Sequence, residues 1–142
     1  MTIAAILEKK GGEVVSIPAA TSVRDAVALL AERRIGAVPV VEGEGVAGIV
    51  SERDVIYCLK SDGAAILDWP VSRIMTAPAI TIERAVSALA ALSQMTRRRI
   101  RHLPVVEGGK LVGIVSIGDL VAYRISRIED EAEAMRAYIQ SA

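Results

Sequence analysis

The chain of 142 residues has one cysteine, one histidine, no phenylalanine and no net charge, and these scarcities exclude several classes of protein. A single cysteine cannot form an intrachain disulfide. Cys58 and His102 together are too few for a structural zinc site, which needs about four such ligands. Because 17 basic residues balance 17 acidic ones, no overall field attracts nucleic acid or an anionic membrane. We therefore expect no metal requirement, no nucleic-acid partner and no membrane partner.

Long apolar runs and catalytic motifs are also missing. No stretch reaches the roughly 18 apolar residues of a membrane span, and the apolar run at residues 3–7 is too short for a signal peptide. The lack of a membrane span and of a signal peptide, together with the single cysteine, predicts a cytoplasmic protein. The chain has no Cys/His pair, no Gly-x-Ser-x-Gly elbow and no Gly-x-x-x-x-Gly-Lys loop. We therefore assign no catalytic residues and do not expect an enzyme.

What the chain does contain is an internal repeat. When the sequence is shifted by 65 residues against itself, 17 of the 41 positions from Val15 to Val55 are identical. Each copy has the same order of strand, helix, hairpin and helix, which predicts an α/β fold of two βαββα units with pseudo-two-fold symmetry. We expect residues 1–66 to hold the first repeat with an N-terminal helix, and residues 67–142 to hold the second repeat with a linker helix and a long C-terminal helix.

Periodicity and turn residues place the elements of each copy. In the first copy we expect strands at 14–17, 38–41 and 46–50, and helices at 22–34 and from 51. In the second copy we expect strands at 79–82, 103–106 and 111–115, and helices at 85–97 and from 116. Short helices are predicted at 2–9 and at 71–75, the latter with Pro70 at its first position. Because each sheet is small, we expect the two sheets to bury their apolar faces against one another.

The C-terminal segment has a heptad pattern of apolar residues on a charged helix. Its members are Val121, Ile125, Ile128, Ala132, Met135 and Ile139. A seam of fewer than three heptads is marginal alone and needs a partner. The sequence leaves two partners open, the chain's own domain or a second copy in a homodimer.

Two pairs of motifs carry a family resemblance. Residues 35–41 with 48–54, and residues 100–106 with 113–119, each combine an apolar-Pro-Val-Val step with Gly-Ile-Val-Ser-x-x-Asp. This pattern resembles the cystathionine-β-synthase (CBS) domain, and the tandem resembles a stand-alone CBS pair of prokaryotic type, or Bateman module, over nearly the whole chain. The resemblance implies a regulatory module that binds an adenine-containing ligand in clefts between the repeats. AMP is the leading candidate, and the others are ADP, ATP, an NAD-type ligand such as NADH, and S-adenosylmethionine. It implies signalling through assembly or an unknown effector protein.

The resemblance also implies site residues of three kinds. The residues that would bind ribose are Ser51, Asp54, Ser116 and Asp119. The residues that would form the adenine and backbone cleft are Ser16, Ile17, Ala37, Val38, Pro39, Thr81, Ile82, Leu103 and Pro104. The residues that would bind phosphate are Arg53, Arg101 and His102.

The chemistry of Ser-x-x-Asp at a helix start agrees with a ribose site and also with a simpler role. A carboxylate can accept hydrogen bonds from both hydroxyls of a diol, while the serine supplies a further partner. The same spacing is typical of a helix-capping pair, and Ser22 with Asp25 has it at another helix start where we assign no ligand. Gly48 and Gly113 precede the motif copies and permit close backbone approach. Capping and ligand binding are compatible, and the sequence leaves both open.

The basic residues are open to two interpretations, and they differ between the copies. The run from Arg97 to His102 is typical of a solvated helix end, but Arg101 and His102 stand where phosphates are expected. His102 could equally be an ordinary surface or core histidine. The first copy has Gly36-Ala37 where the second has Arg101-His102, and Arg53 where the second has Gly118. We therefore expect two sites of unequal affinity, one of which could be empty.

Two other functions compete with nucleotide sensing. A ligand-free CBS scaffold for oligomerisation or protein interaction would show no stabilisation by nucleotides. Nucleic-acid binding through the arginine run ranks lowest, because the chain is neutral and lacks interleaved aromatics for stacking.

Overall fold

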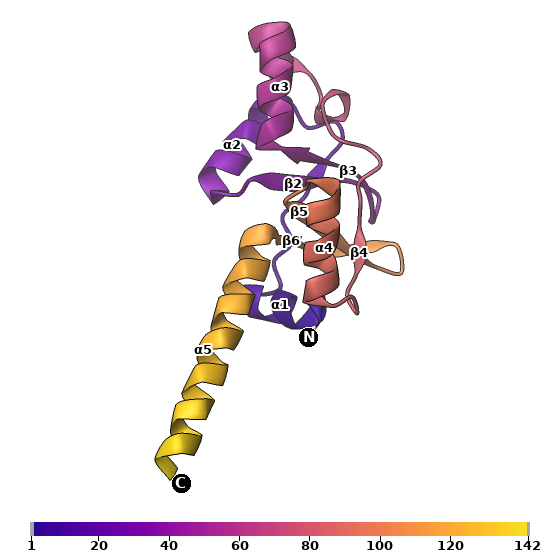
Figure 1. The fold of residues 1–142 in the computed structure, drawn as a ribbon. Coiled ribbons are helices and arrows are strands. Elements are labelled where there is room, and N and C mark those ends of the chain that lie inside the picture. The colour runs from indigo at the N-terminus through magenta and orange to yellow at the C-terminus, as the bar shows by residue number, and fades with distance from the viewer. Residues whose placement is uncertain (1, 142) are drawn as a thin grey trace.

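The structure, a computed structural model, describes residues 2–141 and contains two βαββα repeats (Figure 1). The first repeat comprises β1 (Ile17–Pro18), α2 (Val23–Arg33), β2 (Ala37–Glu42), β3 (Gly45–Ser51) and α3 (Glu52–Asp62). The second comprises β4 (Ile82–Glu83), α4 (Ala88–Arg98), β5 (His102–Glu107), β6 (Lys110–Ser116) and α5 (Ile117–Ser141). Helix α1 (Ile3–Lys10) precedes them, and two 3-10 helices, η1 (Gly63–Asp68) and η2 (Val71–Arg73), connect them. The predicted α/β fold of two similar repeats is confirmed.

The two sheets have the same topology and register. Their strand orders are β1-β2-β3 and β4-β5-β6, with a parallel first pair and an antiparallel second pair. Ile17 pairs with Val40, and the equivalent Ile82 pairs with Val105. Each hairpin shifts register at the same place, between Val40 and Val41 or between Val105 and Val106. The sequence repeat is therefore a structural repeat down to its irregularities.

Each repeat has its own hydrophobic core, and the two sheets also contact one another through β3 and β6. In the first core, Val38, Val40 and Val50 of the sheet pack with α2, α3 and residues of the connecting segment. In the second core, Leu103, Val105 and Val115 pack with α4, α5 and α1. Helices and one extra segment therefore cover one face of each sheet. Pro39, which alternates with Val38 and Val40 along β2, is fully buried outside the first core, and the Leu111 amide donates to the Glu44 carbonyl at 3.1 Å. That the two sheets bury apolar faces against one another stays a prediction.

The segment that precedes each repeat in the chain packs on the other repeat. Helix α1 packs on the second repeat, with Ile3 in its core and the Ile3 amide donating to the Val86 carbonyl at 2.8 Å. The connecting segment packs on the first repeat, with Val71 in its core and the Val71 amide donating to the Thr21 carbonyl at 2.7 Å. Spatial packing thus does not follow chain order, and the division into 1–66 and 67–142 stays a prediction about the chain.

Two helix boundaries differ from the predictions, and one helix is additional to them. The connecting helix expected at 71–75 is a 3-10 turn over Val71–Arg73, with Pro70 as its extended N-cap and not its first helical residue. A second 3-10 helix, η1, precedes it and was not predicted. Helix α4 begins at Ala88, because the hydroxyl of Ser87 accepts from the Ala90 amide and caps the helix there.

Helix α5 projects away from the rest of the molecule (Figure 1). Among its residues only Leu120 is buried, and the heptad positions Val121, Ile128 and Ile139 are 47%, 50% and 65% exposed. The alternative in which the seam packs on the chain's own domain is therefore wrong. No helix within residues 2–141 has both the length and the apolar character required to cross a bilayer.

Candidate functional site

A cleft of about 560 Å³ lies between the two repeats, within the volume range of small-molecule sites. We call it the first cleft. The first repeat contributes the start of α3 and the end of β3, the connecting segment contributes one wall, and the second repeat contributes the turn before β5. The lining residues are Ala37, Ile49, Ser51, Glu52, Arg53, Asp54, Ile56, Tyr57, Thr76, Pro78, Ile80, Arg99, Ile100, Arg101 and His102.

Ser51 and Asp54 form a capping box at the start of α3 and also line the first cleft. The Asp54 amide donates to the Ser51 hydroxyl at 3.3 Å, and the Ser51 amide donates to Asp54 Oδ2 at 2.8 Å. The hydroxyl of Thr76 donates to Asp54 Oδ1 at 3.1 Å. The capping interpretation is therefore confirmed, and it fixes the Asp54 carboxylate in the cleft by bonds to both of its oxygens.

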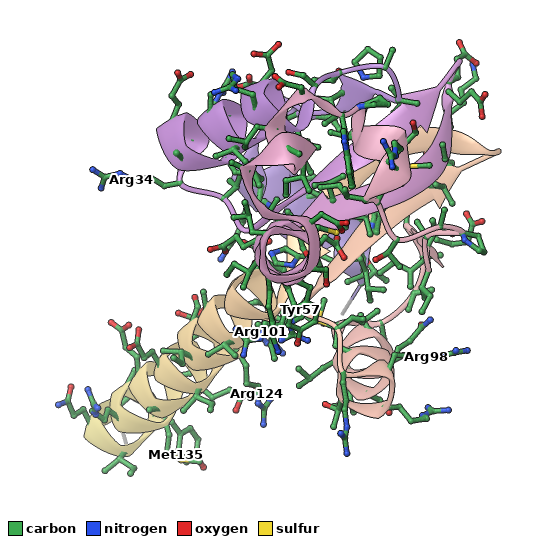
Figure 2. All side chains as sticks on the ribbon, turned by 90° about the horizontal axis from the view of Figure 1, so that it is seen from above. Arg34, Tyr57, Arg98, Arg101, Arg124 and Met135 are labelled. Carbon is green, nitrogen blue, oxygen red and sulfur yellow. The ribbon has the colours of Figure 1, made fainter. Side chains whose placement is uncertain are left out.

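Basic residues of the second repeat line the same cleft as this carboxylate. Arg99, Arg101 and His102 line the cleft with Arg53. Arg101 lies with Tyr57 of α3 between the two repeats (Figure 2). The cleft therefore carries a carboxylate on the first repeat and positive charge from the second.

His102 lies in a half-buried position where several charges act on it. Burial lowers its pKa most, and the charges of Lys10 and Arg101 act in the same direction. The carboxylates of Glu52 and Asp119 act in the opposite direction, and the pKa of His102 remains below its usual value. The imidazole is therefore biased toward its neutral form.

The second Ser-x-x-Asp pair has the same cap but a different neighbour. The Asp119 amide donates to the Ser116 hydroxyl at 3.1 Å, and the Ser116 amide donates to Asp119 Oδ2 at 2.8 Å. The Lys10 ammonium also donates to Asp119 Oδ2 at 2.8 Å. Burial by itself raises the pKa of Asp119, but the hydrogen bonds from Lys10 and Ser116 outweigh it and hold that pKa below its usual value. Neither Ser116 nor Asp119 lines the first cleft.

The Ser22–Asp25 pair behaves as a cap without a site. The Asp25 amide donates to the Ser22 hydroxyl at 3.1 Å, and neither residue lines the first cleft. Spacing alone therefore does not place a Ser-x-x-Asp pair at a cavity.

The structure gathers only some of the other predicted site residues at the first cleft. Arg53, Arg101 and His102 line it, as does Ala37 from the predicted adenine set. The side chains of the remaining adenine set lie outside its lining, and Val38 and Leu103 are fully buried in the two cores. The predicted residues outside the lining are Ser16, Ile17, Val38, Pro39, Thr81, Ile82, Leu103 and Pro104.

Nine lining residues were not among the predicted site residues, namely Ile49, Glu52, Ile56, Tyr57, Thr76, Pro78, Ile80, Arg99 and Ile100. Thr76, Pro78 and Ile80 come from the stretch between the repeats, and Arg99 is the C-cap of α4. Pro78 in an otherwise apolar stretch was the available signal for an extended wall beside β3. Thr76 exchanges two backbone hydrogen bonds with Ile49, at 3.0 and 2.9 Å, which brings that wall into place.

The close approach at the two motif glycines is made by protein and not by ligand. A Cβ on Gly48 would lie 2.7 Å from the Thr76 carbonyl oxygen and 2.8 Å from Met75 Sδ. A Cβ on Gly113 would lie 2.6 Å from Leu7 Cδ2. These glycines therefore make room for other parts of the protein and not for a ligand. Gly48 lets the segment with Met75 and Thr76 pass close to its sheet, and Gly113 does the same for the helix with Leu7. Within residues 2–141, no three His, Cys, Asp or Glu side chains gather in a way that could hold a metal ion.

Known proteins share this arrangement. The family model of the CBS domain matches residues 6–61 and again 71–126. The chain is 33% identical, over 98% of its length and 72% of the relative's, to CBS domain-containing protein CBSX3, mitochondrial, of Arabidopsis thaliana. It spans only 22–23% of three longer CBS domain-containing proteins of the same plant.

Two solved structures are similar over most of their chains. One is a putative signal-transduction protein with CBS domains from Burkholderia ambifaria, with TM-score 0.82, 40% identity and coverage of 89% of this chain and 95% of that one. The other is CBS domain protein PAE2072 from Pyrobaculum aerophilum complexed with AMP, with TM-score 0.75, 28% identity and coverage of 84% and 89%. With two family matches that cover most of the residues and the fold that these structures share, the chain belongs to the CBS domain family and carries a pair of CBS domains.

Proposed function

We propose that the protein is a regulatory module that binds an adenine nucleotide in the first cleft, with AMP as the preferred ligand. The observation that carries this proposal is the joint presence of Asp54 from one repeat and Arg101 with His102 from the other in one cavity. A nucleotide has a neutral diol next to an anionic phosphate, so it needs an acceptor at one place and positive charge at another. The first cleft offers both.

The ribose would bind at the start of α3. The capping box and Thr76 already hold the Asp54 carboxylate in one orientation, so little freedom is lost when two hydroxyls donate to it. Each carboxylate oxygen has two lone pairs, and Asp54 Oδ1 accepts from Thr76 alone, so it has room for a ribose hydroxyl. Oδ2 already accepts from the Ser51 amide and the Ser51 hydroxyl, so the Ser51 hydroxyl would turn from Oδ2 to the ribose when a second ribose hydroxyl binds there.

The adenine would lie against the apolar wall. Ile49, Ile80 and Ile100 line the cleft together with Ala37 and Pro78 and supply a surface for a flat ring. These residues come from both repeats and from the stretch between them, so a bound ring would contact all three parts of the molecule.

The phosphate would meet the second repeat. Arg99 and Arg101 can each form charge-assisted hydrogen bonds to phosphate oxygens, and His102 can donate to one. Arg53 is available for further phosphates of ADP, ATP or NADH. The AMP complex of PAE2072 supports AMP as the first ligand. The surplus of cations over carboxylates in the lining favours a phosphate over the cationic sulfonium of S-adenosylmethionine.

The output of binding would pass through assembly or a partner, without catalysis by this chain. The exposed seam of α5 favours a homodimer in which each copy covers the other's apolar residues. A ligand that binds both repeats would favour one relative arrangement of them, and an effector protein could read that shift. The cytoplasm remains the proposed compartment, although one relative is named as mitochondrial.

Thermal unfolding with millimolar AMP, ADP, ATP, NADH or S-adenosylmethionine tests the proposal. At 100 times its Kd a ligand stabilises the fold by about 2.7 kcal/mol, which raises the Tm of a domain of this size by about 5–10 °C. We expect the largest rise with AMP, and its loss in D54N. The matched control is D25N, which alters a Ser-x-x-Asp pair away from the cleft and should keep the rise. If no ligand raises the Tm, a ligand-free scaffold replaces the proposed sensor.

A further inference from the structure

We propose that Lys10 removes Asp119 from ligand binding, so that each chain binds one adenine nucleotide, in the first cleft, despite its two ribose motifs. This inference rests on the proposed function and assigns a specificity role to a lysine outside both motifs. Lys10 ends α1, which packs on the second repeat beside β6 and α5 (Figure 1).

The Lys10 ammonium bonds to the carboxylate of the second motif and to the strand beside it. It donates to Asp119 Oδ2 at 2.8 Å and to the Ile114 carbonyl at 2.8 Å. The same Oδ2 accepts from the Ser116 amide. Both side chains are partly shielded, with 36% of Lys10 and 24% of Asp119 exposed. A charge-assisted bond of this kind is stronger than a bond from a neutral hydroxyl, so a ribose cannot readily displace it.

The equivalent place in the first repeat is built differently. There Asp54 Oδ1 accepts from the neutral hydroxyl of Thr76, and Thr76 exchanges both backbone hydrogen bonds with Ile49. That bridge draws the connecting segment along β3 and forms the wall of the first cleft.

In the second repeat this bridge is replaced by the lysine. The repeat offset places Lys10 at the position of Met75 and Gly11 at the position of Thr76. The Gly11 amide bonds to the Glu8 carbonyl and not to Ile114, whose carbonyl accepts from the Lys10 ammonium. The cavity that reaches Asp119 has about 230 Å³, includes Lys10 in its lining and does not include Ser116.

The facing wall also differs in charge. The first cleft receives Arg101 and His102 from the opposite repeat, and the equivalent positions of the first repeat are Gly36 and Ala37. A phosphate at the second motif would therefore receive no cation from these two positions of the opposite repeat, and of the two side chains only His102, which pairs with Ser116 in its own sheet, lies near that motif. The lysine and the missing cations both oppose a second nucleotide.

Isothermal titration of the full chain with AMP tests the inference. We expect one AMP per chain, a Kd raised at least tenfold in D54N, and a Kd within twofold of the unmodified protein in D119N. In K10M, which copies the first repeat's Met75, and in K10Q, we expect a second and weaker binding event. Circular dichroism melts identify the variants that are folded.

The outcomes separate this inference from the proposed function. Two AMP molecules per unmodified chain, or a D119N variant as weak as D54N, would overturn the inference and leave nucleotide binding intact. A single event in both K10M and K10Q, when folded, would overturn the role of Lys10. No heat with AMP, ADP, ATP or NADH would contradict the proposed function itself and the inference with it.

Discussion

At the scale of single residues, Gly48 and Gly113 occupy equivalent positions but face obstacles of different stiffness. A methyl group on Gly48 would meet the backbone oxygen of Thr76, whereas one on Gly113 would meet the end of the Leu7 side chain. A backbone bridge cannot move aside as readily as a leucine rotamer can. We expect G48A to lower the free energy of unfolding by about 2–3 kcal/mol and G113A by about 1 kcal/mol, as measured by urea denaturation. Equal losses of unfolding free energy in the two variants would contradict this difference between the two glycine positions.

His102 predicts a pH dependence of stability. Its pKa in the folded protein lies below the value of about 6.5 in the unfolded chain, chiefly because of burial, with Glu52 and Asp119 opposing and Lys10 and Arg101 adding to the shift. Between the lowered pKa and about 6.5 the unfolded chain therefore binds more protons, so stability falls as the pH drops through this window. Urea denaturation from pH 5 to 7.5 should show this decline, and H102N should flatten it. An equal decline in H102N would mean that other groups cause it.

The residues of the site could be predicted only where their roles are local. The caps at Ser51 and Ser116 depend on neighbours three residues away, so the sequence contains all that is needed to infer them. The contact between Lys10 and Asp119 joins residues 109 positions apart, and no periodicity or spacing indicates it. The adenine set was placed less well, because a run of apolar residues does not reveal which members enter a core.

At the scale of elements, α2 and α4 are each followed by a C-cap arginine in the left-handed conformation. Arg34 has φ 53° and Arg99 has φ 55°. This conformation costs a residue with a side chain about 1–2 kcal/mol, and glycine loses about 0.4–1 kcal/mol through its freer unfolded state. We therefore expect R34G and R99G each to raise the free energy of unfolding by about 0.5–1 kcal/mol, as measured by urea denaturation.

The same pair of variants separates stability from binding. Arg34 points away from the molecule (Figure 2), whereas Arg99 lines the first cleft. R99G should weaken AMP binding at least about tenfold, the loss of roughly one hydrogen bond to a charged group, and R34G should leave it unchanged. A stability loss in either variant would contradict the strain argument.

The elements themselves were largely predictable, and their partners were not. Apolar periodicity and the serine caps locate the four helices of the two repeats to within a few residues. The packing of α1 on the second repeat depends on contacts such as Ile3 with Val86, which distant parts of the chain make. Two nearly equivalent repeats offer similar surfaces, so sequence alone does not say which repeat a flanking segment covers.

At the scale of the whole molecule, the exposed seam of α5 predicts self-association. Ile128 lies on this seam and is half exposed, and Asp130 lies on the opposite side of the helix, two residues further on. Light scattering should give the unmodified protein twice its 15.0 kDa chain mass. I128K should reduce this to the mass of one chain, because a charge would be buried in the seam, and D130K should not. A monomeric unmodified protein, or an I128K variant that stays dimeric, would contradict the proposed homodimer.

The central claim is that AMP occupies the first cleft between the two repeats, and a crystal structure of the protein grown with AMP tests it most directly. The account predicts one AMP per chain, with its ribose hydroxyls on Asp54, its ring against Ile80 and its phosphate near Arg101. It also predicts that Lys10 still holds Asp119. AMP bound at Asp119, or an empty first cleft at saturating AMP, would contradict it.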